Sequence, residues 1–136
     1  MSHLLRKGAL YFSAGALGGL ANAIAVWFGG SKGITAAFGV MISPPLTPAM
    51  LYHRIAWGGI WGLIFFLPLT VKSTILKALL YSLGPTFVQL FIIFPERAHK
   101  GMMGLQLGTL TPLLVVIFNL IWALTALLFL KASGES

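Results

Sequence analysis

Four long runs of apolar residues dominate this chain, and its few charged residues lie in narrow bands between them. The runs cover 8–28, 55–71, 75–94 and 105–130. A helix needs about 20 apolar residues to cross the hydrocarbon core of a bilayer, and its backbone amides must be satisfied within the helix itself. We therefore predict an all-α integral membrane protein, with residues 1–136 forming a single compact bundle of about four transmembrane helices.

The overall composition supports this class. Apolar residues make up 58% of the chain and charged residues only 8%, whereas soluble domains are roughly half apolar and about a quarter charged. A β-barrel would need segments of about ten residues that alternate in polarity, and runs such as 113–121 do not alternate. The first run is longer than the apolar part of a signal peptide, about 7 to 15 residues, so we expect it to be retained as a helix.

The segment 33–51 is apolar enough to enter a bilayer but carries Ser43, Pro44, Pro45 and Pro48 at its middle. Proline removes a backbone donor and breaks a helix. A broken backbone is tolerated at membrane depth only where protein or a water-filled cavity covers it. We favour a loop along the surface, and a re-entrant pair of half-helices or a fifth span are the alternatives.

Orientation rests on the distribution of lysine and arginine, which collect in cytoplasmic loops. With four spans, the basic residues divide almost evenly between the two sides. One side holds Arg6, Lys7, Lys72, Lys77 and Lys131, and the other holds Lys32, Arg54, Arg97 and Lys100. The pair before the first run favours a cytoplasmic N-terminus, and we predict a location in the bacterial inner membrane. Dual insertion as an antiparallel dimer is a further hypothesis, motivated by the weak bias.

The formal net charge of +7 would suggest nucleic-acid binding in a soluble protein. Here the basic residues stand singly or in pairs at the ends of apolar runs, where their side chains can reach lipid headgroups. No exposed domain exists to present them as a groove. We therefore predict the lipid bilayer as a partner and no nucleic acid.

Glycines recur at intervals of four, the spacing that lets membrane helices approach closely. The candidate packing positions are Gly15, Gly19, Gly58, Gly62, Gly104 and Gly108. The motif serves contacts within one bundle and contacts between chains equally well. We expect packing within the bundle, and self-association or binding to another membrane subunit is the alternative use.

Polar and aromatic residues within the runs are candidates for a polar path or a ligand site. They are Asn22, His53, Arg54, Trp57, Trp61, Ser82, Thr86, Gln89 and Asn119. His53, Trp57 and Trp61 share one helix face, so His53 with Arg54 could form a polar mouth above an aromatic-lined path. The alternatives are an interfacial anchor at this position and hydrogen bonds between helices at the deeper positions. Pro85 and Pro112 could kink the third and fourth helices and free a carbonyl in each.

Groups for catalysis are scarce. The acidic residues are Glu96 and Glu135, and neither lies within a predicted span. Cation-coupled transport usually needs a carboxylate within the spans, so this class is disfavoured. The chain has no cysteine and three scattered histidines, so a metal or haem site lacks ligands. We expect no enzyme activity and no cofactor. An enzyme would have to use residues at the ends of the spans, such as His53, His99 and Glu96.

Two function classes lead. The first is a non-catalytic accessory or assembly subunit of a membrane complex, or a homo-oligomeric scaffold, because the loops are minimal and the glycine motifs favour tight packing. The alternative is a small channel or carrier for an anionic, lipid or amphipathic solute, which His53, Arg54 and the proline-broken segment would suit.

Overall fold

The computed structural model describes residues 2–40, 46–69, 71–92, 108 and 110–134, and the described residues form helices with short connections. The helices are α1 (Ser2–Ser31), α2 (Ile34–Ala37), α3 (Pro48–Trp61), the 3-10 helix η1 (Gly62–Phe66), α4 (Thr74–Val88) and α5 (Thr111–Ala132). No strand occurs in this part of the chain, so the all-helical class is confirmed there.

Three helical segments are long and apolar enough to cross a membrane, namely His3–Ser31, Thr74–Ile92 and Thr111–Ala132. They overlap the first, third and fourth apolar runs. The first extends beyond its run at both ends, so the basic residues that precede the run lie on the first turns of α1.

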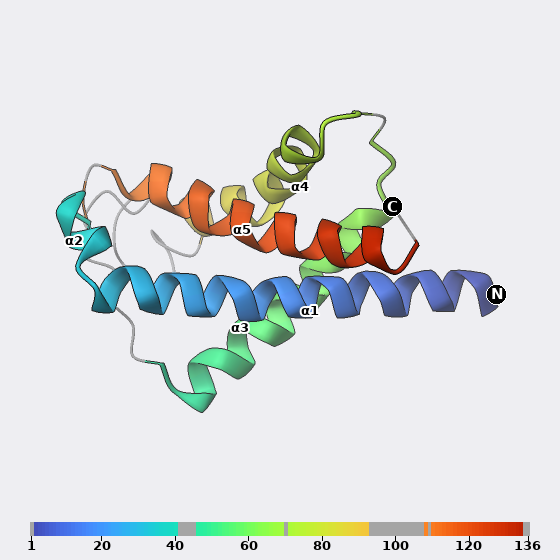
Figure 1. The fold of residues 1–136 in the computed structure, drawn as a ribbon, viewed down its shortest axis with the longest axis horizontal. Helices are drawn as coiled ribbons and strands as arrows, with labels where there is room; N and C mark the ends of the chain where they lie inside the picture. Colours follow the sequence, from blue (N-terminus) through green and yellow to red (C-terminus); the bar gives the residue numbers. More distant parts are fainter. Residues whose placement is uncertain (1, 41–45, 70, 93–107, 109, 135–136) are drawn as a thin grey trace.

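The central helix of the bundle is α1 (Figure 1). It packs against α3, η1 and α5, and α4 packs against α5. Because α1 and α5 run in opposite directions, the beginning of α1 and the end of α5 lie at the same end of the molecule. We call this the N-terminal end.

The second helical segment differs in position from the predicted run 55–71. It begins at Pro48, and its α-helical and 3-10 parts together end at Phe66. The Thr47 hydroxyl oxygen accepts a 3.1 Å hydrogen bond from the Met50 backbone nitrogen, which caps the helix, and proline suits the first turn because no backbone donor is needed there. Pro48 therefore marks the start of a helix, and the described residues directly before it are not helical. At the other end Leu67 is extended, as expected for a residue that precedes a proline.

The length of this second segment bears on the number of spans. α3 has 14 residues and η1 has five, which correspond to a combined length of about 30 Å at the usual rise of each helix type. The hydrocarbon core of a bilayer is also about 30 Å thick. The length is compatible with a fourth pass, which stays a prediction.

Of the segment 33–51, the structure describes 33–40, with the short helix α2 and the left-handed Gly33 and Gly39, and 46–51, where α3 begins. Ser43, Pro44 and Pro45 lie outside the described residues. The choice between a surface loop, a re-entrant pair and a fifth span therefore stays a prediction.

The start of the last helix also differs from the predicted run. α5 begins at Thr111 rather than at 105, and Pro112 falls in its first turn. A proline there displaces no hydrogen bond within the helix, so the prediction that Pro112 kinks the fourth helix is wrong. Pro85 does lie inside α4. The helical backbone continues after α4 as a π-helical turn over 89–92.

An aromatic cluster fills the core at the N-terminal end. The Phe65 ring stacks on Trp122 at a centroid distance of 5.6 Å and meets the edge of Tyr81 at 4.8 Å. Tyr11 contacts the same ring at 6.3 Å. Fully buried alanines on α1, α4 and α5 surround these rings, because small side chains let the helices close around a large aromatic group.

Candidate functional site

The crossing of α1 and α3 is made of glycine. Gly15 and Gly19 of α1 face Gly58 of α3 and Gly62 of η1. A methyl group added to Gly58 would lie 2.6 Å from the carbonyl oxygen of Gly15, and one added to Gly15 would lie 2.7 Å from the Cα of Gly62. No side chain fits between these backbones, so two of the predicted small-residue pairs lie against each other within one chain.

The third predicted pair is different. Gly104 lies outside the described residues, and Gly108 precedes α5 instead of belonging to it. Gly108 has a φ of 153° and lies beside the backbone of Gly39 and Val40. The prediction that Gly108 forms a helix-packing face is therefore wrong, and its left-handed backbone and close approach to Gly39 account for glycine at this position.

Sequence reasoning missed the contact between α1 and α5. The indole Nε1 of Trp122 donates a 3.0 Å hydrogen bond to the backbone oxygen of Gly15, in the buried interior. A methyl group on Gly18 would lie 2.8 Å from Cδ1 of the same indole. A tryptophan within an apolar run does signal a need for an acceptor, but nothing in the sequence identifies which carbonyl supplies it.

The deeper polar residues bond to one another across the bundle. Nη1 of Arg54 donates a 2.6 Å hydrogen bond to Oδ1 of Asn22, and Nδ2 of Asn22 donates a 2.8 Å bond to the backbone oxygen of Phe118. These two bonds join α3 to α1 and α1 to α5. Nδ2 of Asn119 donates a 3.0 Å bond to Oγ1 of Thr86 and so joins α5 to α4.

We call Asn22, Arg54, Thr86, Gln89 and Asn119 the polar seam. All of them were predicted from the sequence as candidates for a polar path. The cavity between four of them, Asn22, Arg54, Gln89 and Asn119, has a volume of about 20 Å³. That volume holds about one water molecule, whereas ligand pockets usually exceed about 300 Å³. The seam therefore links all four long helices and leaves little room for a solute.

The other predicted residues do not join the seam. His53 is exposed, and its ring lies 6.4 Å from that of Trp57, which is also exposed. Arg54 points to α1 instead, so the structure does not bring His53 and Arg54 into one polar mouth. Trp61 lies against Gly84 of α4. Ser82 is fully buried and donates a 2.7 Å hydrogen bond to the Leu79 carbonyl of its own helix.

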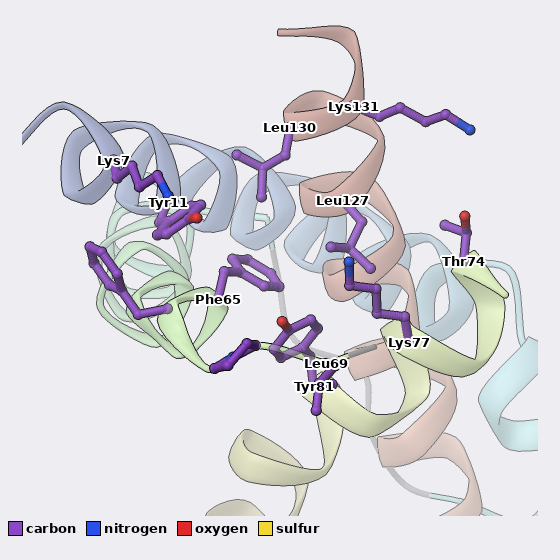
Figure 2. Close-up of a pocket in the computed structure, with 12 residues that line it drawn as sticks. Lys7, Tyr11, Phe65, Leu69, Thr74, Lys77, Tyr81, Leu127, Leu130 and Lys131 are labelled. Carbon is purple, nitrogen blue, oxygen red and sulfur yellow. The ribbon is translucent and has the colours of Figure 1, made fainter. Parts of the chain in front are cut away.

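A larger cavity opens at the N-terminal end, and sequence reasoning did not predict it. Its volume is about 370 Å³. Side chains from α1, η1, the connection after η1, α4 and α5 line it, as Figure 2 shows. The lining residues are Lys7, Tyr11, Phe65, Phe66, Pro68, Leu69, Thr74, Lys77, Tyr81, Leu127, Leu130 and Lys131. We call this cavity the lysine pocket.

The three lysines of the pocket take different positions. Lys7 and Lys77 are half-buried and reach toward the pocket from opposite sides, whereas Lys131 is exposed and its side chain points outward, away from the other labelled residues (Figure 2). The Tyr11 hydroxyl points toward the centre. The Tyr81 hydroxyl donates a 2.5 Å hydrogen bond to the Leu67 carbonyl, which holds that ring in place.

The charge of this pocket is positive. It contains three lysines, while the whole chain has only two acidic side chains, Glu96 and Glu135, both outside the described residues. The sequence did assign Lys7, Lys77 and Lys131 to one side of the bundle, and that grouping was the signal from which the site could have been found.

Among the described residues, no group of three or more histidine or acidic side chains is placed to hold a metal ion. Comparison of the chain with protein-family models, with curated proteins and with solved structures finds no match. The function is therefore inferred from the residues and geometry of the chain itself.

Proposed function

We propose that this chain is a multi-pass protein of the bacterial inner membrane, with four helical passes and a cytoplasmic N-terminus. In this proposal it acts without catalysis, as an accessory or assembly subunit of a membrane complex or as a homo-oligomeric scaffold. The following observations support the proposal.

Large apolar side chains on the outside of the bundle support the membrane location. Tyr52, Trp57, Ile75, Phe87 and Leu128 are all more than half exposed. Soluble proteins rarely leave extended apolar surface in contact with water, whereas lipid tails match such a surface. Together with the three helices of sufficient length, this surface favours burial in a bilayer.

The distribution of charge supports the proposed orientation. Lys7, Lys77 and Lys131 line one pocket at the N-terminal end. Arg6 is adjacent to Lys7 in α1, and Lys72 lies in the connection that leads into α4. A cluster of basic residues at one end of a bundle favours the cytoplasmic side for that end.

The observation that carries the non-catalytic role is the polar seam. Four of its five residues, Arg54, Asn22, Asn119 and Thr86, form hydrogen bonds with one another or with the Phe118 backbone. Hydrogen bonds between polar groups of different helices stabilise a particular packing of those helices. Their arrangement therefore favours a structural role.

The glycines at the contact of α1 with α3 and η1 bear on where a partner would bind. Gly15, Gly19, Gly58 and Gly62 face one another within the chain, so they are occupied and do not offer a surface for another subunit. A partner would instead contact the outward apolar faces, such as the one that carries Trp57 on α3.

The test is gentle extraction of the tagged chain from its native membrane, followed by native mass spectrometry. A stoichiometric foreign subunit or a defined homo-oligomer is the expected result. The variant Trp57→Ala, on the outer face, should weaken the assembly if that face is the contact, whereas Trp122→Phe alters the interior as a comparison. A bare monomer across several mild detergents and lipid nanodiscs would contradict the proposal.

A second candidate is a small carrier for an anionic or amphipathic solute, and the lysine pocket favours it. A pocket of about 370 Å³ is in the range of ligand sites. Flux of anions into liposomes that contain the chain tests this candidate. Permeability equal to that of empty liposomes for every anion tried would exclude it.

A further inference from the structure

We propose that the lysine pocket binds a phosphate group, with Lys7 and Lys77 as its two inner cationic contacts and Lys131 and Thr74 at its outer edge. This site does not depend on whether the protein is a scaffold or a carrier, because a bound phosphate can serve either. The two sources of such a group are the headgroup of a phospholipid and a soluble phosphate.

The first part of the argument is that the cations are brought together by the fold. Lys7 lies on α1, Lys77 on α4 and Lys131 on α5. Basic side chains that merely extend toward headgroups lie exposed at the end of a bundle, as Arg6 of α1 and Lys72 of the connection before α4 do. Lys7 and Lys77 are half-buried instead and approach a shared cavity from opposite sides (Figure 2). Two like charges directed at one space are best accommodated when an anion lies between them.

The second part concerns the floor of the pocket, which is held in place. Phe65 stacks on the buried Trp122, and the Tyr81 ring meets Phe65 edge-on while its hydroxyl bonds to the Leu67 carbonyl. Because these rings are fixed by neighbours on other elements, the shape of the cavity does not depend on the lysines alone. A preformed cavity costs less free energy to fill than one that must be organised on binding.

The third part identifies the chemistry of the ligand. A phosphate carries one to two negative charges on several oxygens, each of which accepts hydrogen bonds, and lysine binds it as a point charge. The pocket offers ammonium groups on two sides and hydroxyl groups on Tyr11 and Thr74. Donors on α1 and α4 around one cavity suit a group with several acceptor oxygens better than a single halide ion.

The apolar residues of the pocket indicate what could be attached to the phosphate. Phe66, Leu127 and Leu130 stand beside the cations, so the pocket can hold an apolar or glycerol portion next to the phosphate. Basic pockets between helices on the cytoplasmic side of a membrane are a recurring form of headgroup site. An anionic phospholipid therefore fits both the charge and the lining.

The experiment compares two double variants of the full chain in a neutral detergent. Lys7→Gln with Lys77→Gln removes the two inner cations, and Arg6→Gln with Lys72→Gln removes two exposed positive charges at the same end as a matched control. Far-UV circular dichroism and thermal unfolding establish that each variant is folded. Binding of phosphatidylglycerol and of inorganic phosphate is then followed by native mass spectrometry.

The expected result is that the pocket variant loses about tenfold or more in apparent affinity for phosphatidylglycerol. The control variant should lose less than about threefold, since exposed charges are screened by salt. Retention of phosphatidylglycerol that inorganic phosphate does not displace identifies the lipid headgroup as the source. Saturable binding of inorganic phosphate, lost in the same variant, identifies a soluble phosphate instead.

A second measurement remains informative if the pocket variant does not fold. Amine-reactive labelling of the wild-type chain, read by mass spectrometry, reports the accessibility of each lysine. Phosphatidylglycerol or inorganic phosphate should protect Lys7 and Lys77 and leave Lys72 reactive. Equal protection of all three lysines, or equal loss of binding in both double variants, would overturn the proposal, because either result means a general attraction to charge.

Discussion

Arg54 and Asn22 form the only hydrogen bond between two side chains that involves a charged group in the part of the chain described by the structure. Nη1 of Arg54 lies 2.6 Å from Oδ1 of Asn22, while Nδ2 of Asn22 donates to the Phe118 carbonyl. A single amide side chain on α1 thus holds both α3 and α5. The Asn22 amide oxygen accepts from the Arg54 guanidinium, and the amide nitrogen donates to the Phe118 carbonyl.

Replacing the Asn22 amide should lower the free energy of unfolding, because the Arg54 guanidinium then lacks its hydrogen-bond acceptor. Asn22→Leu leaves the half-buried guanidinium of Arg54 without its acceptor, and we expect a loss of about 2 kcal/mol in the free energy of unfolding. The double variant Asn22→Leu with Arg54→Leu should lose less, since it removes the cation as well. Unfolding in detergent measures both, and a double variant that is less stable than Asn22→Leu would contradict this account.

The glycine crossing predicts a position-dependent effect of a single methyl group. Gly15→Ala should lower the free energy of unfolding by about 1 to 3 kcal/mol, because the methyl meets the backbones of Gly58 and Gly62 and the helices must separate. Gly8→Ala in the same helix is the matched control, since its methyl would lie 3.7 Å from Cζ of Phe66, an ordinary van der Waals contact. Alanine favours a helix over glycine, so this control should be neutral or slightly stabilising in thermal unfolding.

Removing the indole N–H of Trp122 should lower the free energy of unfolding by a smaller amount, through the loss of one hydrogen bond. Trp122→Phe keeps an aromatic ring beside Phe65 but removes the donor to the Gly15 carbonyl, and we expect a loss of about 1 kcal/mol in stability. Trp57→Phe, on an exposed side chain, should change stability by less than about 0.5 kcal/mol. Equal effects of the two substitutions on the unfolding midpoint would show that the hydrogen bond contributes nothing.

The bond between α5 and α4 can be measured by a double-mutant cycle. Asn119→Ala, Thr86→Ala and the double variant should give a coupling energy of about 0.6 kcal/mol, the average for hydrogen bonds between membrane helices. The 3.0 Å distance between Asn119 Nδ2 and Thr86 Oγ1 supports a direct bond. Strictly additive effects of the two substitutions would argue that the two side chains do not interact.

Much of the helical architecture follows from local information. Long uncharged runs cannot satisfy their backbone in lipid except as helices, and the predicted runs at 8–28, 75–94 and 105–130 overlap α1, α4 and α5. The boundaries were less predictable. Pro48 and Pro112 both lie in the first turn of a helix, where proline displaces no hydrogen bond. The sequence alone did not show whether the residues before each proline would be helical.

Part of the candidate site could likewise be predicted from the sequence, and part depends on the packing of the helices. Spacing placed Gly15 with Gly19 on one face and Gly58 with Gly62 on another, because helical periodicity is a local property. The lysine pocket could not be found this way, since Lys7, Lys77 and Lys131 belong to three separate helices. Periodicity shows which side of each helix is small, polar or charged, but long-range packing selects which helix meets that side. That packing brings Arg54 to Asn22 and three distant lysines to one cavity.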